Sequence, residues 1–153
     1  MKIPARALPL AALALVAAGC STVNPITTQM AYDASDGVSV ELGDVTGLNL
    51  LVITEAEGSA AVLTGSFKNS GAEDATVAAS LDGGSIVSIE IPAGATVRLG
   101  GDEGETHVAG TSTAAPGLLQ EVLFQTETAG QISEDVPVLD GTLPEYAPEL
   151  DSL

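Results

Sequence analysis

The stretch Val87-Ser88-Ile89-Glu90-Ile91 alternates apolar and polar side chains at every step, and Pro92-Ala93-Gly94 follows it directly. Alternation with a period of two places successive side chains on opposite faces of an extended chain, as in a β-strand that is buried on one face. The proline and glycine that follow mark a turn. Residues 87–91 are therefore predicted to form a strand whose apolar side chains face a core.

The same pattern recurs on both sides of this strand. Apolar alternation or short apolar runs predict extended segments at 38–42, 48–53, 61–68, 76–81, 95–99, 106–109 and 132–139. Turn sequences such as Asn69-Ser70-Gly71 and Asp82-Gly83-Gly84 separate them. Residues 117–128 fit either a strand or one face of a helix, and we favour the strand. Short strands at this spacing predict an all-β fold, a β-sandwich of about seven strands.

The predicted core is mainly aliphatic, because the chain has no Trp and only two Phe and two Tyr. Abundant glycine and few lysines or arginines also favour strands over helices. The side chains predicted to point inward are Val38, Val40, Leu63, Phe67, Val87, Ile89, Ile91, Val97, Val122, Phe124 and Val136.

The N-terminus carries the marks of an export signal. Lys2 and Arg6 precede an apolar run from Leu8 to Ala18, which is shorter than the roughly 20 residues that a membrane span needs. The only cysteine of the chain, Cys20, follows Ala-Ala-Gly directly, as in the lipobox of bacterial lipoproteins. This resemblance implies a signal peptide at 1–19 and a diacylglyceryl group on the Cys20 sulfur. An ordinary signal cleaved elsewhere, with Cys20 discarded, is the alternative.

After Cys20 the sequence predicts a lipidated tether at 20–35, one β-sandwich domain at 36–140 and an acidic, proline-containing tail at 141–153 that is expected to be loose. All 21 acidic residues but only two basic ones, Lys68 and Arg98, follow Cys20, for a formal charge of −19. Electrostatic binding to nucleic acid is excluded, since it requires clustered lysine and arginine. Solubility is the favoured interpretation of this charge, and a cationic partner or a multivalent cation is the alternative.

Three segments resemble one exported family. Phe67-Lys68-Asn69-Ser70-Gly71 is similar to its strand and N-x-G turn, and Ile91-Pro92-Ala93-Gly94-Ala95-Thr96-Val97 to its IPAGGTV segment. Residues 122–138 resemble its closing segment, which ends in Val136-Pro137-Val138. The family is that of the periplasmic copper(I) chaperones, PCuAC, with lipoprotein relatives in actinobacteria. The resemblance covers roughly residues 38–139 and implies an Ig-like, cupredoxin-like β-sandwich.

Members of this family hold Cu(I) with two histidines and two methionines, because soft thioethers select that ion. One pair comes from a loop before the IPAGG segment, where this chain has neither residue type. The other comes from a His-x-Met motif, which here is His107-Val108-Ala109, while Met30 lies in the predicted tether. The chain is thus a divergent relative that lacks most copper ligands. No metal site is predicted, and His107, with Glu105, is only a weak candidate.

The sequence does not match the motifs for nucleophilic catalysis, calcium binding or phosphate binding. No serine sits in a Gly-x-Ser-x-Gly elbow, and no catalytic residue or cofactor site is predicted. The carboxylate clusters at 33–37 and 102–105 do not match a calcium-binding loop, and Gly100-Gly101 has no lysine after it to hold a phosphate.

The leading hypothesis is a non-enzymatic, lipid-anchored binding or accessory protein on the outer face of a cytoplasmic membrane. Its partner is expected to be a protein, and the resemblance points to envelope or respiratory membrane complexes. The alternative is a degenerate or altered copper chaperone, a metal-handling protein.

Overall fold

The computed structural model describes residues 33, 35–82, 84–100, 106–151 and 153. They belong to one compact unit, Asp33–Leu153. The predicted signal peptide, Cys20, Met30 and almost all of the predicted tether lie outside the described residues, as does the acidic loop 102–105. Within the described ranges, no helix is long and apolar enough to cross a membrane.

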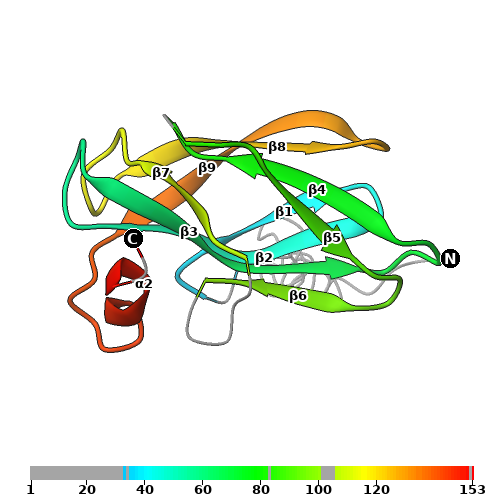
Figure 1. Cartoon of the computed structure of the whole chain (residues 1–153), viewed down its shortest axis with the longest axis horizontal. Helices are drawn as coiled ribbons and strands as arrows, with labels where there is room; N and C mark the ends of the chain where they lie inside the picture. Colours follow the sequence, from blue (N-terminus) through cyan, green and yellow to red (C-terminus); the bar gives the residue numbers. More distant parts are fainter. Residues whose placement is uncertain (1–32, 34, 83, 101–105, 152) are drawn as a thin grey trace, which may run out of the picture. The chain divides into compact units, whose positions relative to one another are not determined.

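The unit is almost entirely β-structure (Figure 1). Nine strands and one short helix follow one another along the described chain: β1 Val38–Leu42, β2 Val45–Thr54, β3 Ala60–Asn69, β4 Ala75–Ser80, β5 Val87–Ile91, β6 Thr96–Leu99, β7 Val108–Thr111, β8 Leu119–Thr126, β9 Gly130–Leu139 and α2 Ala147–Asp151. The strand predicted at 87–91 has the predicted bounds. The ambiguous segment 117–128 forms strand β8, as favoured.

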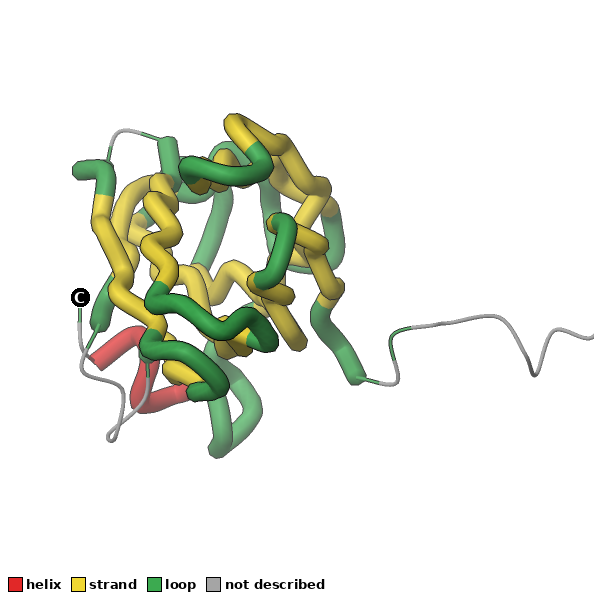
Figure 2. The backbone as a smooth tube through the Cα atoms, turned by 90° about the vertical axis from the view of Figure 1, so that its right-hand side faces the viewer, coloured by secondary structure: helices red, strands yellow, loops and turns green. Residues whose placement is uncertain are grey.

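The strands form a sandwich around one interior (Figure 2). Seven of them follow the order β5-β4-β8-β9-β2-β3-β6, while β1 pairs with β2 and β7 pairs with β3 at the sides of this path. All pairings are antiparallel except that of β2 with β9, which joins Val52 to Val138 and Ile53 to Leu139. The all-β sandwich is confirmed, and the prediction of about seven strands matches the main path, with β1 and β7 added.

The interior is filled by the side chains that alternation predicted to point inward. Phe67 and Phe124 lie at its centre with their rings edge to face and the centroids 5.9 Å apart. Of the eleven predicted core residues, eight are buried, and Val38, Val87 and Val97 are partly buried against them. The inward assignment is therefore confirmed along every strand that it covered.

A bulge interrupts the pairing of β2 with β3 between Leu48 and Leu51. Asn49 adopts a left-handed conformation there, with φ of 51°, and its side-chain oxygen accepts a hydrogen bond from the Gly37 N–H at 2.9 Å. Gly65 lies opposite with φ of 129°, and a Cβ at this position would lie 2.7 Å from the Asn49 carbonyl oxygen. Only glycine permits so close an approach of two backbones.

The Asn69-Ser70-Gly71 turn is held by the side chain of its first residue, which is fully buried. The Asn69 Oδ1 accepts from the Gly71 N–H at 2.8 Å. Its Nδ2 donates to the Glu73 carbonyl oxygen at 2.8 Å and to the Ile91 carbonyl oxygen at 3.0 Å. Asn69 therefore ties the β3–β4 turn to the end of β5, which gives this motif a structural role.

The C-terminal segment differs from the loose tail that the sequence predicted. Helix α2 follows β9, and Tyr146 and Leu150 pack with Leu139 on the outer face of β2 and β3. The side chains that they cover there are Leu51, Ile53 and Val62. These three side chains belong to strands whose other face already fills the core, so apolar surface on the outer face requires a second cover. The tail supplies it.

Candidate functional site

The two segments to which the resemblance assigns copper ligands lie side by side. The loop after β4 meets β7, where Asp82 pairs with Thr111, and the Thr111 N–H donates to the Asp82 carbonyl oxygen at 2.8 Å. Further along the loop, Gly84 approaches the backbone of Ala109 and Gly110 so closely that a Cβ on Gly84 would overlap the Ala109 carbonyl oxygen. The fold therefore brings these segments together through backbone contact.

His107 immediately precedes β7, and its side chain is exposed. Val108 is fully buried, and Ala109 is exposed on the same side as His107, as the alternation of the motif predicted. Glu105, proposed from the sequence as a second ligand, lies outside the described residues. Ala109 has only a methyl group at the position where the resemblance implies a thioether donor.

No group of three or more His, Cys, Asp or Glu side chains that could hold a metal ion occurs among the described residues. His107 is the single histidine of the chain, and Cys20 and both methionines lie in the undescribed N-terminal part. One exposed imidazole provides one borderline donor, whereas selective Cu(I) binding needs several soft donors. The described residues therefore do not fit the four-ligand copper site of the resembled family.

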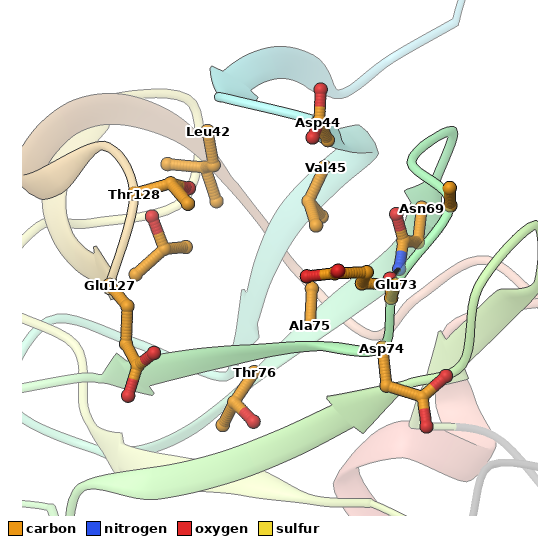
Figure 3. Close-up of a pocket in the computed structure, with 12 residues that line it drawn as sticks. Leu42, Asp44, Val45, Asn69, Glu73, Asp74, Ala75, Thr76, Glu127 and Thr128 are labelled. Atoms are coloured by element: carbon orange, nitrogen blue, oxygen red, sulfur yellow. Dashed lines mark hydrogen bonds between the residues drawn. The ribbon is translucent and has the colours of Figure 1, made fainter.

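A separate cavity of about 430 Å³ opens between the β1–β2, β3–β4 and β8–β9 turns (Figure 3). Four carboxylate residues, Asp44, Glu73, Asp74 and Glu127, line it together with apolar residues such as Leu42 and Val45. The Asp74 carboxylate already accepts a hydrogen bond from the Ala93 N–H at 2.9 Å, which secures the turn between β5 and β6. These four acids come from three turns, and they form no cation site in the described part of the chain.

Sequence reasoning did not find the contact of Gly84 with β7. The turn sequence Asp82-Gly83-Gly84 predicted a bend, which requires glycine for its backbone angles. In the structure Gly84 is required for space instead, because its missing side chain leaves room for the neighbouring backbone. A pairing between residues so far apart in sequence leaves no local signal.

No protein-family profile matches the sequence, and neither does any curated protein. Solved structures do match. The structure described as "Copper-bound PCuAC domain from PmoF2" superposes with a TM-score of 0.52 at 18% identity, over 67% of this chain and 98% of that one. The structure described as "Apo PCuAC domain from PmoF1" gives a TM-score of 0.53 at 14% identity, over 66% and 98%.

Each match thus spans nearly the whole of the solved domain. At such low identity the likeness concerns the fold, and it agrees with the divergence that the missing ligands indicated. The chain has a PCuAC-like fold.

Proposed function

We propose that this chain is a non-enzymatic accessory protein that is held by lipid on the extracytoplasmic face of the membrane and binds another protein there. One observation carries the proposal. The segments that hold copper in the resembled family meet in this fold at Gly84 and Ala109, where backbone fills the contact, and within these two segments His107 is the one histidine or methionine. A PCuAC-like fold without the family's copper donors still presents a surface on which another protein can bind, and this is the function that we propose.

The anchor rests on the sequence around Cys20. Only a thiolate can form the thioether to the diacylglyceryl group, and two acyl chains suffice for stable membrane attachment without a spanning helix. We expect Cys20→Ser to move the protein from the membrane fraction to the released fraction after cell disruption. Retention of Cys20→Ser in the membrane at the level of the unchanged protein would contradict the anchor.

The non-enzymatic part of the proposal rests on the surroundings of the candidate groups. Ser112 is buried, and its hydroxyl oxygen lies 2.7 Å from the Ala114 carbonyl oxygen and 2.9 Å from Gln120 Oε1, two acceptors that share its single proton. This serine therefore secures the loop before β8. A nucleophile requires a neighbouring base and access to substrate, and the one imidazole that could act as a base, that of His107, is exposed immediately before β7, whereas Ser112 is buried.

Metal handling is the second candidate, and the fold favours it, since one of the similar structures is described as copper-bound. In this chain it would require a ligand set other than that of the resembled family, with His107 as its only imidazole. Envelope or respiratory membrane complexes are the setting that the resemblance implies for either function.

Affinity capture from detergent-solubilised membranes separates the two functions. The unchanged protein and His107→Ala are captured in parallel, with and without a Cu(I) chelator, and bound proteins are quantified by mass spectrometry. We expect the same partner in equal amount under all four conditions. Loss of the partner on chelation and in His107→Ala would contradict the proposal and favour metal handling.

A further inference from the structure

Exposed apolar side chains gather at one place on the described surface. Among the described residues five large hydrophobic side chains are exposed, and three of them, Leu118 and Leu119 at 58% and Leu143 at 47%, come from two segments that meet beside β9. Pro116 and Gly117 from one segment, and Leu143 and Tyr146 from the other, line a cavity of about 280 Å³ together with Leu139. We call Pro116, Leu118, Leu119 and Leu143 the β8-entry surface.

Backbone hydrogen bonds hold the first wall of this surface in place. The Gly117 N–H donates to the Val138 carbonyl oxygen at 2.8 Å, and the Val138 N–H donates to the Leu118 carbonyl oxygen at 2.9 Å. These bonds extend the ladder between β8 and β9, in which Leu119 lies opposite Pro137. The loop before β8 is therefore fixed against the sheet.

The second wall is held by the C-terminal segment. The Tyr146 and Ala147 N–H groups both donate to the Leu143 carbonyl oxygen, at 2.9 and 3.1 Å, and the Tyr146 side chain packs with the outer apolar cluster of β2 and β3. Because both walls are ordered by the fold, docking here costs little conformational entropy. A contiguous exposed apolar patch with polar residues at its border is typical of an interaction site.

The charge around the surface limits what can dock there. The Asp140 carboxylate lines the cavity and accepts hydrogen bonds from the N–H and the hydroxyl of Thr142, which lower the pKa of Asp140 below its usual value. The carboxylate is thus ionised at neutral pH beside an apolar cavity. A second copy of the chain is disfavoured as the occupant, since both copies would carry a formal charge of −19 after Cys20.

We propose that the β8-entry surface docks a segment of the partner protein that presents a large apolar side chain next to lysine or arginine. The apolar side chain enters the cavity between Pro116 and Leu143, and the basic group meets Asp140. This inference rests on the proposed function as a protein-binding accessory and identifies the part of the domain that does the binding.

The test uses a defined probe, the fluorescein-labelled peptide Gly-Lys-Leu-Lys-Phe-Lys-Gly. Fluorescence anisotropy follows its binding to the full-length protein in phosphatidylcholine nanodiscs, with empty nanodiscs as the blank. One control peptide has Glu in place of each Lys, and another has Ser in place of Leu and Phe. We expect only the basic, apolar peptide to bind, since the surface requires both properties.

Variants then locate the binding. Leu119→Ser and Leu143→Ser are each expected to weaken binding about tenfold, because each removes apolar surface that the peptide buries. Asp140→Asn is expected to weaken it about threefold and to reduce its salt dependence. Ile86→Ser is the matched control, since Ile86 is even more exposed, at 73%, but lies before β5, and it should leave binding unchanged.

Three results would overturn the inference. The basic, apolar peptide does not bind at millimolar concentration, the Glu peptide binds as tightly as the Lys peptide, or Ile86→Ser weakens peptide binding as much as Leu143→Ser does. A concentration-dependent dimer in sedimentation that Leu143→Ser dissolves would instead make a second copy the occupant. Failure of the proposed function can be told apart from failure of this inference. It would appear in the affinity capture, as a partner that is lost on copper chelation, whether or not the peptide binds.

Discussion

Replacement of Asn69 by alanine should cost the domain about 3 kcal/mol of unfolding free energy. The Asn69 side chain is fully buried and makes three hydrogen bonds, to the backbone of Gly71, Glu73 and Ile91. Each contributes about 1 kcal/mol net, and a buried carbonyl left without its donor raises the cost. Single domains unfold with only about 5–15 kcal/mol, so this loss is a large fraction of the total.

Urea unfolding of the full chain, followed by far-UV circular dichroism, measures the effect. With a slope of roughly 1.5 kcal/mol per molar urea, the midpoint should fall by about 2 M. Ser70→Ala is the matched control, because Ser70 is the exposed neighbour in the same turn, and it should change the free energy by less than about 0.5 kcal/mol. Equal midpoints for Asn69→Ala and Ser70→Ala would refute the structural role of Asn69.

Two further predictions concern the contact of the loop with β7 and the C-terminal segment. Gly84→Ala should lower the unfolding free energy by about 1–3 kcal/mol, because its Cβ meets the backbone of Ala109 and Gly110; urea unfolding beside the exposed control Ser85→Ala checks this, and equal values would contradict it. Burial, and after it the hydrogen bond to Asp36 and the Asp36 charge, raise the pKa of Tyr146. The neutral Tyr146 phenol therefore stabilises the folded state. This contribution to the unfolding free energy is complete below the ordinary tyrosine pKa of about 10, and it is lost as the pH rises through the higher pKa of the folded state. Ultraviolet titration should show one tyrosine that ionises above the ordinary tyrosine pKa, and this step should be missing in Tyr146→Phe. A titration that is the same in Tyr146→Phe would contradict the prediction.

Most of the strands were predictable because one face of each is buried and the other is solvated. Val87 to Ile91 shows this best, since its alternation coincides with the bounds of β5. The same logic placed His107 and Ala109 on one exposed side and Val108 inside. Period-two patterning fixes the facing of each side chain locally, without reference to the rest of the chain.

The C-terminal helix escaped prediction because its pattern is short and is interrupted by Pro144 and Pro148. A signal existed elsewhere. The apolar run from Leu48 to Ile53 has almost no polar alternation, which is typical of a strand buried on both faces, and such a strand needs a second covering element. Leu51 and Ile53 find that element in Tyr146 and Leu150. Which segment would provide it depends on long-range packing that local patterns do not contain.

A competition titration with a chromogenic Cu(I) chelator tests most directly whether this PCuAC-like domain has lost its copper site. We expect binding no tighter than about micromolar, because one imidazole is a weak and unselective ligand. Ala109→Met should tighten binding, since it places a thioether on the exposed side of His107, and it serves as the positive control. Stoichiometric transfer of Cu(I) from the chelator to the unchanged protein at sub-nanomolar free copper would contradict the proposal and restore the copper chaperone.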